Sequence, residues 1–118
     1  MVKLPEYGKV ICDVLVEHTK IPYSYGDIQQ ETVFDKEQNR YLVMILGREP
    51  TPELSPTATR RVHGCLIHVD IIGERVFIQR DGTEEGIVKE LMAAGIPEDK
   101  IVLAYKSKRL RRDLGLAI

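Results

Sequence analysis

The chain contains no tryptophan, only two cysteines and no apolar run long enough to cross a membrane. Its longest unbroken apolar stretch, YLVMIL at residues 41–46, is far shorter than the ~20 residues of a membrane-spanning helix. The start, MVKLPEYGK, lacks the features of a secretory signal. We therefore expect a cytoplasmic protein that is not attached to a membrane. Because thiols stay reduced in that compartment, Cys12 and Cys65 are predicted to be small buried residues.

The sequence also lacks glycine-rich phosphate-binding motifs. Its nine glycines are scattered, and neither GxxxxGK nor GxGxxG occurs, which disfavours a nucleotide-driven enzyme. A formal net charge of -1 argues against a surface that binds polyanions as a whole. The 118 residues, 43% hydrophobic and 30% charged, instead predict one globular domain over residues 1–118, with no cofactor.

Hydrophobic periodicity predicts the order of the secondary-structure elements. Apolar residues at steps of three and four predict helices over residues 5–20 and 83–94. Strands are predicted over residues 27–34, 41–46, 61–72, 75–80 and 101–105, and an exposed proline-rich loop over residues 48–57. This order, α-β-β-β-β-α-β, predicts an α+β fold with helices packed on one face of an antiparallel sheet.

Gly73 and Glu74 predict a tight hairpin between the third and fourth strands. In that register one side carries the pairs Ile71–Val76, Val69–Ile78 and Ile67–Arg80, which we predict to face the core. The other side carries the pairs Asp70–Phe77, His68–Gln79 and Leu66–Asp81. This mixture of polar and apolar side chains suits contact with a subunit or partner better than contact with bulk water.

The segment QRDGTEEG, residues 79–86, is either a catalytic or metal-binding loop or the turn that joins a strand to a helix. Asp81 or Thr83 can cap the following helix, and Gly82 can supply the turn. Glu84 follows Asp81 by three residues, as in a capping box. A calcium loop would need a helix on both sides, whereas a strand precedes this segment. We therefore predict a structural role.

Three potential metal ligands, His63, Cys65 and His68, lie on the third predicted strand. The strand period of two places His63 and Cys65 on one face and His68 on the other, which argues against a shared ion. The same geometry separates Cys65 from His68 and Asp70 and argues against nucleophilic chemistry. We predict no catalytic and no metal-binding residues, and we interpret His68, Asp70 and Gln79 as a hydrogen-bonded polar patch.

The one local concentration of charge is KSKRLRR at residues 106–112. This segment is either a solvated end of the chain or a site that contacts phosphate or an acidic protein. No helix-turn-helix or zinc-finger spacing accompanies it. The candidate nucleic-acid-binding residues are Lys106, Lys108, Arg109, Arg111 and Arg112.

Three stretches of the chain together resemble one protein family. They are IPYSYGD (21–27), FDKEQNRYLVM (34–44) and GCLIHVDIIGERVFIQRDGTEEGIVKELMAAGIPEDKIVLAY (64–105). They are similar to the XisI family of cyanobacterial proteins, which is named as a controlling factor for excision of a DNA element inserted in a nitrogen-fixation operon. The resemblance implies an α+β fold, self-association, and an accessory role beside a site-specific recombinase and a companion protein, XisH.

Together these observations predict a non-enzymatic accessory factor that acts through protein contacts, as a homo-oligomer and with an XisH-like companion. Contact with DNA is then indirect, through these proteins, or direct, through the basic segment. The expected contact surface comprises His68, Asp70, Phe77 and Gln79, bordered by Arg80, Asp81, Gly82, Thr83 and Glu84. Two alternatives stay open: an inhibitory or stabilising partner of a nuclease-like XisH protein, and a small-molecule-binding or hydrolytic domain that uses His68 and Asp70.

Overall fold

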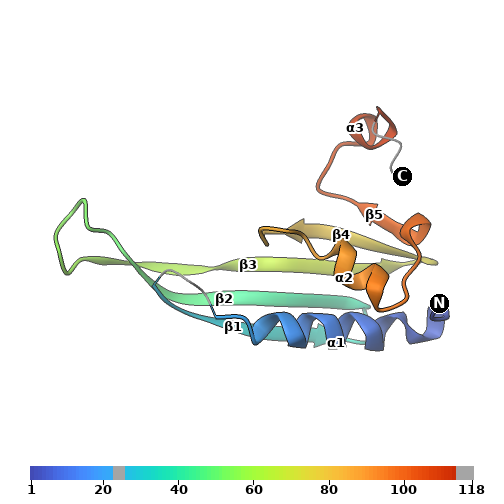
Figure 1. Ribbon diagram of the computed structural model, residues 1–118, viewed down its shortest axis with the longest axis horizontal. Helices are drawn as coiled ribbons and strands as arrows, with labels where there is room; N and C mark the ends of the chain where they lie inside the picture. Colours follow the sequence, from blue (N-terminus) through green and yellow to red (C-terminus); the bar gives the residue numbers. More distant parts are fainter. Residues whose placement is uncertain (23–25, 114–118) are drawn as a thin grey trace.

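The computed structural model describes residues 1–22 and 26–113, with side chains as far as Leu110. The elements follow the predicted order, with two short 3-10 helices and a C-terminal helix in addition (Figure 1). They are η1 (Leu4–Glu6), α1 (Tyr7–Thr19), β1 (Asp27–Asp35), β2 (Arg40–Pro50), β3 (Thr59–Ile72), β4 (Arg75–Asp81), α2 (Val88–Ala93), η2 (Glu98–Lys100), β5 (Ile101–Leu103) and α3 (Lys108–Asp113).

Helix α1 forms because its apolar side chains recur on one side. The buried residues lie three or four positions apart and face the sheet: Tyr7, Ile11, Val14 and Leu15. The α-helix begins two residues later than predicted, because Pro5 lies in the preceding 3-10 turn.

The five strands form one sheet in the order β1-β2-β3-β4-β5. The first three pairings are antiparallel, as predicted, but β5 runs parallel to β4. The expectation of a wholly antiparallel sheet is therefore wrong at this edge. The reason is the connection through α2, which carries the chain back so that β5 starts at the same end of the sheet as β4.

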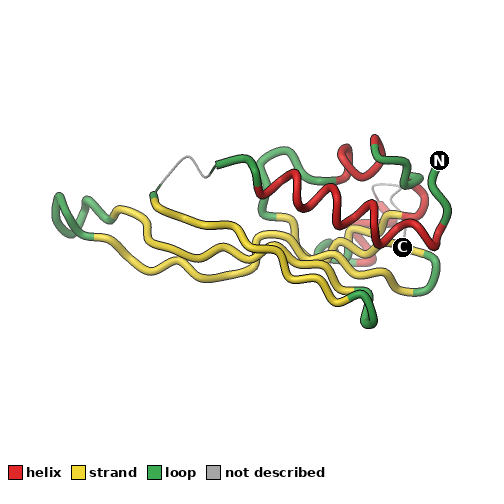
Figure 2. The backbone as a smooth tube through the Cα atoms, turned by 90° about the horizontal axis from the view of Figure 1, so that it is seen from below, coloured by secondary structure: helices red, strands yellow, loops and turns green. Residues whose placement is uncertain are grey.

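Helices α1 and α2 lie on the same side of the sheet, as predicted (Figure 2). The core lies between these helices and the sheet. Its fully buried side chains include Ile11 and Leu15 of α1, Val43 and Ile67 of the sheet, and Leu91 just before the end of α2. In the described part of the chain, no helix lies over β1, β2 or β3 on the opposite side of the sheet.

Strands β2 and β3 extend beyond the helices as a two-stranded arm, at the left of Figure 1. β2 runs to Pro50, which pairs with Thr59, so the loop predicted at residues 48–57 begins three residues later than expected. Proline is tolerated there because it is the last residue of the strand. The amide of Thr51 closes the tip by donating to the carbonyl oxygen of Ala58 at 2.9 Å.

The hairpin of β3 and β4 turns at Gly73 and Glu74, as predicted. The pairs Ile71–Val76, Val69–Ile78 and Asp70–Phe77 are confirmed. The predicted pairs Ile67–Arg80, His68–Gln79 and Leu66–Asp81 are wrong, because His68 pairs with Arg80 and Ile67 with Asp81. A register shift between His68 and Val69 makes Gln79 an extra residue on β4, which is a β-bulge.

Candidate functional site

A second β-bulge, in β3, changes which side chains share a face. Val43 of β2 pairs with Ile67, but the next residue, Met44, pairs with Cys65, so Leu66 is the extra residue. Leu66 and Ile67 are consequently both buried, at 6% and 0% exposure. Strict alternation of side chains between the two faces therefore fails at this point in β3.

The bulge places His63, Cys65 and His68 on the same face. Directly paired residues on antiparallel strands have their side chains on the same side of the sheet. Cys65 pairs with Met44, and His68 pairs with Leu42, two positions away on β2. The prediction that His68 lies on the opposite face from His63 and Cys65 is therefore wrong, because period-two counting does not allow for an inserted residue.

We call the side of the sheet away from α1 and α2 the open face. On β1 to β4 it comprises Asp27, Gln29, Glu31, Val33, Asp35, Arg40, Leu42, Met44, Leu46, Arg48, Arg61, His63, Cys65, His68, Asp70, Ile72, Arg75, Phe77 and Arg80. Its apolar side chains are only partly covered: Leu42, Met44, Leu46 and Phe77 are half-buried, while Val33 and Ile72 are 49% and 52% exposed. Partly exposed apolar side chains bordered by polar residues are typical of an interaction site.

Asp70 anchors a polar cluster on the open face. Its Oδ1 lies 2.9 Å from His68 Nε2, and its Oδ2 accepts a hydrogen bond from Gln79 Nε2 at 3.3 Å. Arg40 Nε lies 3.9 Å from Oδ1. The Asp70 side chain is only 12% exposed, and His68 and Gln79 supply the hydrogen bonds that a buried carboxylate needs. The three residues of the predicted polar patch thus form one hydrogen-bonded cluster.

Cys65 shares the open face with His68 but is not an activated thiol. Its Sγ donates a weak hydrogen bond to the carbonyl oxygen of Ile67 at 3.2 Å. Burial raises the pKa of the Cys65 thiol, against a smaller lowering by the positive charge of Arg80. The protonated thiol is a poor nucleophile. Nucleophilic chemistry at Cys65 is therefore disfavoured by protonation rather than, as predicted, by its position.

Asp81 organises the turn before α2 instead of capping a helix that starts beside it. Its Oδ1 accepts hydrogen bonds from the Thr83 amide at 3.1 Å and the Thr83 hydroxyl at 2.5 Å. Its Oδ2 accepts from the Ile87 amide at 2.8 Å. Because these bonds hold residues 82–87 in a turn, α2 begins at Val88, five residues later than predicted. Glu84 lies in the turn, so the predicted capping box is wrong.

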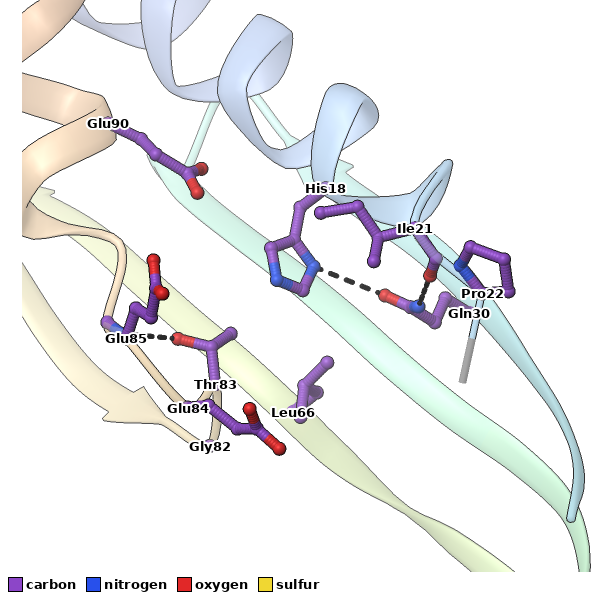
Figure 3. A pocket seen from close by; sticks show the side chains of 11 residues that line it. His18, Ile21, Pro22, Gln30, Leu66, Gly82, Thr83, Glu84, Glu85 and Glu90 are labelled. Carbon is purple, nitrogen blue, oxygen red and sulfur yellow. Dashed lines mark hydrogen bonds between the residues drawn. The ribbon is translucent and has the colours of Figure 1, made fainter. Parts of the chain in front are cut away.

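The same turn forms one wall of a groove of about 490 Å³ on the helix side of the sheet (Figure 3). On the other wall, His18 Nδ1 lies 3.3 Å from Gln30 Oε1, and Gln30 Nε2 donates to the carbonyl oxygen of Ile21 at 2.7 Å. Glu85 and Glu90 lie across the groove from them. The sequence places His18 on the apolar side of α1, and a histidine at a core-facing position is the signal that could have identified this groove.

The residues of the predicted contact surface are divided between the two sides of the sheet. His68, Asp70 and Phe77 lie on the open face, with Gln79 bonded to Asp70 and Arg80 paired with His68. Gly82, Thr83 and Glu84 instead line the groove on the helix side, next to the turn that Asp81 holds. A single flat partner surface cannot contact both groups.

No group of three or more His, Cys, Asp or Glu side chains within residues 1–22 and 26–110 is arranged to hold a metal ion. His63, Cys65 and His68 share a face without forming such a group. Over the same residues, no helix is both long enough and apolar enough to span a bilayer.

Comparison with known proteins assigns this chain to one family. The family model described as XisI protein matches residues 1–118. The chain belongs to the XisI family. No curated protein matches it in sequence.

Two solved structures share the XisI fold seen here. A crystal structure of a XisI-like protein from Anabaena variabilis ATCC 29413 has a TM-score of 0.78 at 25% identity, over 98% of this chain and 99% of that one. The fdxN element excision controlling factor XisI from the same organism has a TM-score of 0.69 at 22% identity, over 93% of this chain and 99% of that one. The predicted α+β fold is confirmed.

In this XisI chain the basic segment begins two residues before α3 and makes up most of that helix, which stands apart from the body of the sheet (Figure 1). Lys108 and Arg109 are exposed and Lys106 is half-buried. The side chains of Arg111 and Arg112 lie outside the described residues. Of the basic side chains that are described, Lys108 and Arg109 lie on this short helix, and Lys106 precedes it.

Proposed function

We propose that this chain is a non-enzymatic accessory factor in the control of DNA excision, and that it acts through protein contacts. Membership of the XisI family supports this proposal, as does the fold shared with a protein named as the fdxN element excision controlling factor. The observation that carries it is the open face, where half-buried apolar side chains such as Leu42 and Phe77 lie beside the Asp70 cluster.

The open face suits a protein partner better than a small substrate. Small-molecule sites are concave, and the groove lined by His18 lies on the other side of the sheet. The carboxylate of Asp70 is already hydrogen-bonded by His68 and Gln79. Protein interfaces combine a less polar centre with a polar rim, which is the pattern of this face.

An XisH-like companion protein is the partner to test first. The purified chain is mixed with the companion, and the mixture is separated on a sizing column. We expect a stable complex, which is lost in Phe77→Asp because the introduced charge would be buried at the contact. Val16→Asp is the matched control, since Val16 is 39% exposed on α1 and far from the open face.

Circular dichroism and urea unfolding establish that both variants keep the fold. No complex with the folded parent chain would contradict a role through this companion. A complex that forms equally well with Phe77→Asp would contradict the assignment of the open face.

Direct contact with DNA through the basic segment is a separate part of the proposal. Contacts of Lys and Arg with phosphate are salt-sensitive and carry no sequence information. The parent chain is expected to shift a DNA duplex in a low-salt mobility assay, and the combined replacement of Arg109, Arg111 and Arg112 by alanine is expected to abolish the shift. If the parent chain shifts no DNA, direct contact through this segment is ruled out.

A further inference from the structure

The groove on the helix side of the sheet carries three carboxylates across from His18 (Figure 3). They belong to Glu84, Glu85 and Glu90. Among the described residues, none of these three side chains has a hydrogen-bond or ion-pair partner, and no lysine or arginine lines the groove. Asp81 adds a further carboxylate in the same turn. The groove is therefore a cavity of negative charge, and its volume of about 490 Å³ is typical of sites for small ligands.

His18 adds a hydrogen-bond acceptor on the opposite wall, because Gln30 fixes the protonation of its ring. Gln30 Nε2 donates to the carbonyl oxygen of Ile21 at 2.7 Å, which leaves Gln30 Oε1 3.3 Å from His18 Nδ1. An amide oxygen cannot donate, so Nδ1 of the neutral imidazole carries the proton and Nε2 is an acceptor. Figure 3 shows Nε2 turned toward the wall formed by residues 82–86.

The donors beside these acceptors are already engaged. The Thr83 hydroxyl donates to Asp81 Oδ1 and accepts from the Gly86 amide. Lys20, which lines the adjoining cavity, is paired with Glu17 at 2.8 Å. The described side-chain groups of the groove that have no partner are thus the carboxylates and the imidazole nitrogen, all of which accept. A ligand that fits here must supply both positive charge and several hydrogen-bond donors.

We propose that this groove binds a guanidinium group, carried by a small free molecule or by an arginine side chain of another protein. A planar guanidinium directs several N–H donors outward from a delocalised positive charge, so one group can meet acceptors on both walls. Leu66 and Ile21 also line the groove and give the methylene groups of such a ligand apolar contacts. The site lies on the opposite side of the sheet from the open face, and it goes beyond the proposed function.

The groove also has room for the chain that carries the guanidinium group. It adjoins a second cavity of about 670 Å³, with which it shares His18, Ile21 and Glu90. That cavity lies between α1 and the end of α2, where Ala93 and Ala94 are small. A ligand longer than one guanidinium group can therefore continue between the two helices.

Titration with guanidinium probes tests the site, and the three histidine rings of the chain report on it. The probes are agmatine and the peptide Gly-Arg-Gly with both ends blocked, and the ring signals are followed by NMR. We expect the His18 signals to shift, while those of His63 and His68, on the open face, stay unchanged. The blocked peptide Gly-citrulline-Gly, which keeps the shape without the charge, is expected not to bind.

The two probes also distinguish the source of the ligand. Tighter binding of agmatine assigns the site to a free small cation, and tighter binding of the peptide assigns it to an arginine side chain of a protein. If neither probe shifts the His18 signals, or if the citrulline peptide shifts them equally, the proposal is overturned.

Removal of two carboxylates tests the site independently. Glu85→Gln combined with Glu90→Gln is expected to weaken binding of the tighter probe by roughly tenfold at low salt. Both residues are exposed, so the fold should be kept, which circular dichroism verifies. Glu37→Gln is the matched control, since Glu37 is exposed in the turn between β1 and β2 and does not line the groove.

The control also separates a site from an effect of overall charge. An equal loss of affinity in Glu37→Gln, or no loss in the combined variant, would contradict the proposal. Phe77→Asp, on the open face, is expected to bind the probes as the parent chain does. The inference can therefore fail while the contact with a companion protein stands, and the reverse also holds.

Discussion

The two sides of the sheet differ although they are built from alternate residues of the same strands. On the helix side, Val43 and Ile78 are completely buried. Their neighbours on the open face, Leu42 and Phe77, are only half-buried. Apolar burial stabilises a fold in rough proportion to the area removed from water, so most of the stability comes from the helix side. The open face keeps apolar area available for association.

The largest expected effect on stability comes from replacing, one at a time, two neighbouring residues of β4. Ile78→Ala leaves a cavity in the core and is expected to lower the free energy of unfolding by about 2–5 kcal/mol. Phe77→Ala, one residue away on the open face, is expected to cost about 1 kcal/mol. Urea unfolding at low protein concentration, where association contributes little, measures both. Equal losses of unfolding free energy in the two variants would contradict the idea that the helix side supplies most of the stability.

A smaller effect is expected at the turn that joins the sheet to α2. Asp81→Ala removes the acceptor of the Thr83 and Ile87 amides, and we expect a loss of about 1–3 kcal/mol because these groups are left without their partner. Faster hydrogen exchange at the two amides would locate the effect. Glu84→Ala, in the same turn but exposed, is expected to stay within about 0.5 kcal/mol of the parent chain. If both variants behave alike, Asp81 does not organise the turn.

The order of elements was predictable from sequence because each depends on local patterns. The apolar spacing of α1 and the Gly73–Glu74 turn are read from a few consecutive residues, and both are confirmed. The parallel pairing of β5 was not predictable in this way, since it depends on how the α2 connection crosses the sheet. The length of the β2–β3 arm likewise depends on pairing between distant residues, which lets β2 continue to Pro50.

The face on which each side chain lies could not be predicted correctly without knowing the positions of the two bulges. Leu66 and Ile67 lie in a run of adjacent apolar residues that interrupts the alternation of β3 at the bulge, but Ile71 and Ile72 interrupt it in the same way without a bulge, so the sequence signal is weak. Gln79 gives no comparable signal, because a polar residue can occupy either face of a half-buried strand. The late start of α2 could not be predicted from the sequence for a different reason. Asp81 is as well suited to hold a turn as to cap a helix, and tertiary packing decides between them.

The smallest expected effect is a loss of stability at alkaline pH. Each side of the sheet has one thiol that contributes to this loss. Burial raises the pKa of Cys12, on α1, and of Cys65, on the open face. The unfolded chain therefore loses these protons first. Stability is complete below the pKa of an unfolded thiol, about 8.5, and falls as the pH rises through the higher pKa values of the folded state.

Urea unfolding between pH 7 and pH 10 measures this loss, and Cys12→Ser and Cys65→Ser are each expected to reduce it. Because burial raises the pKa of both thiols, a loss that is unchanged in both variants would contradict this cause. A loss that is reduced by only one of the two replacements would assign it to the side of the sheet on which that thiol lies.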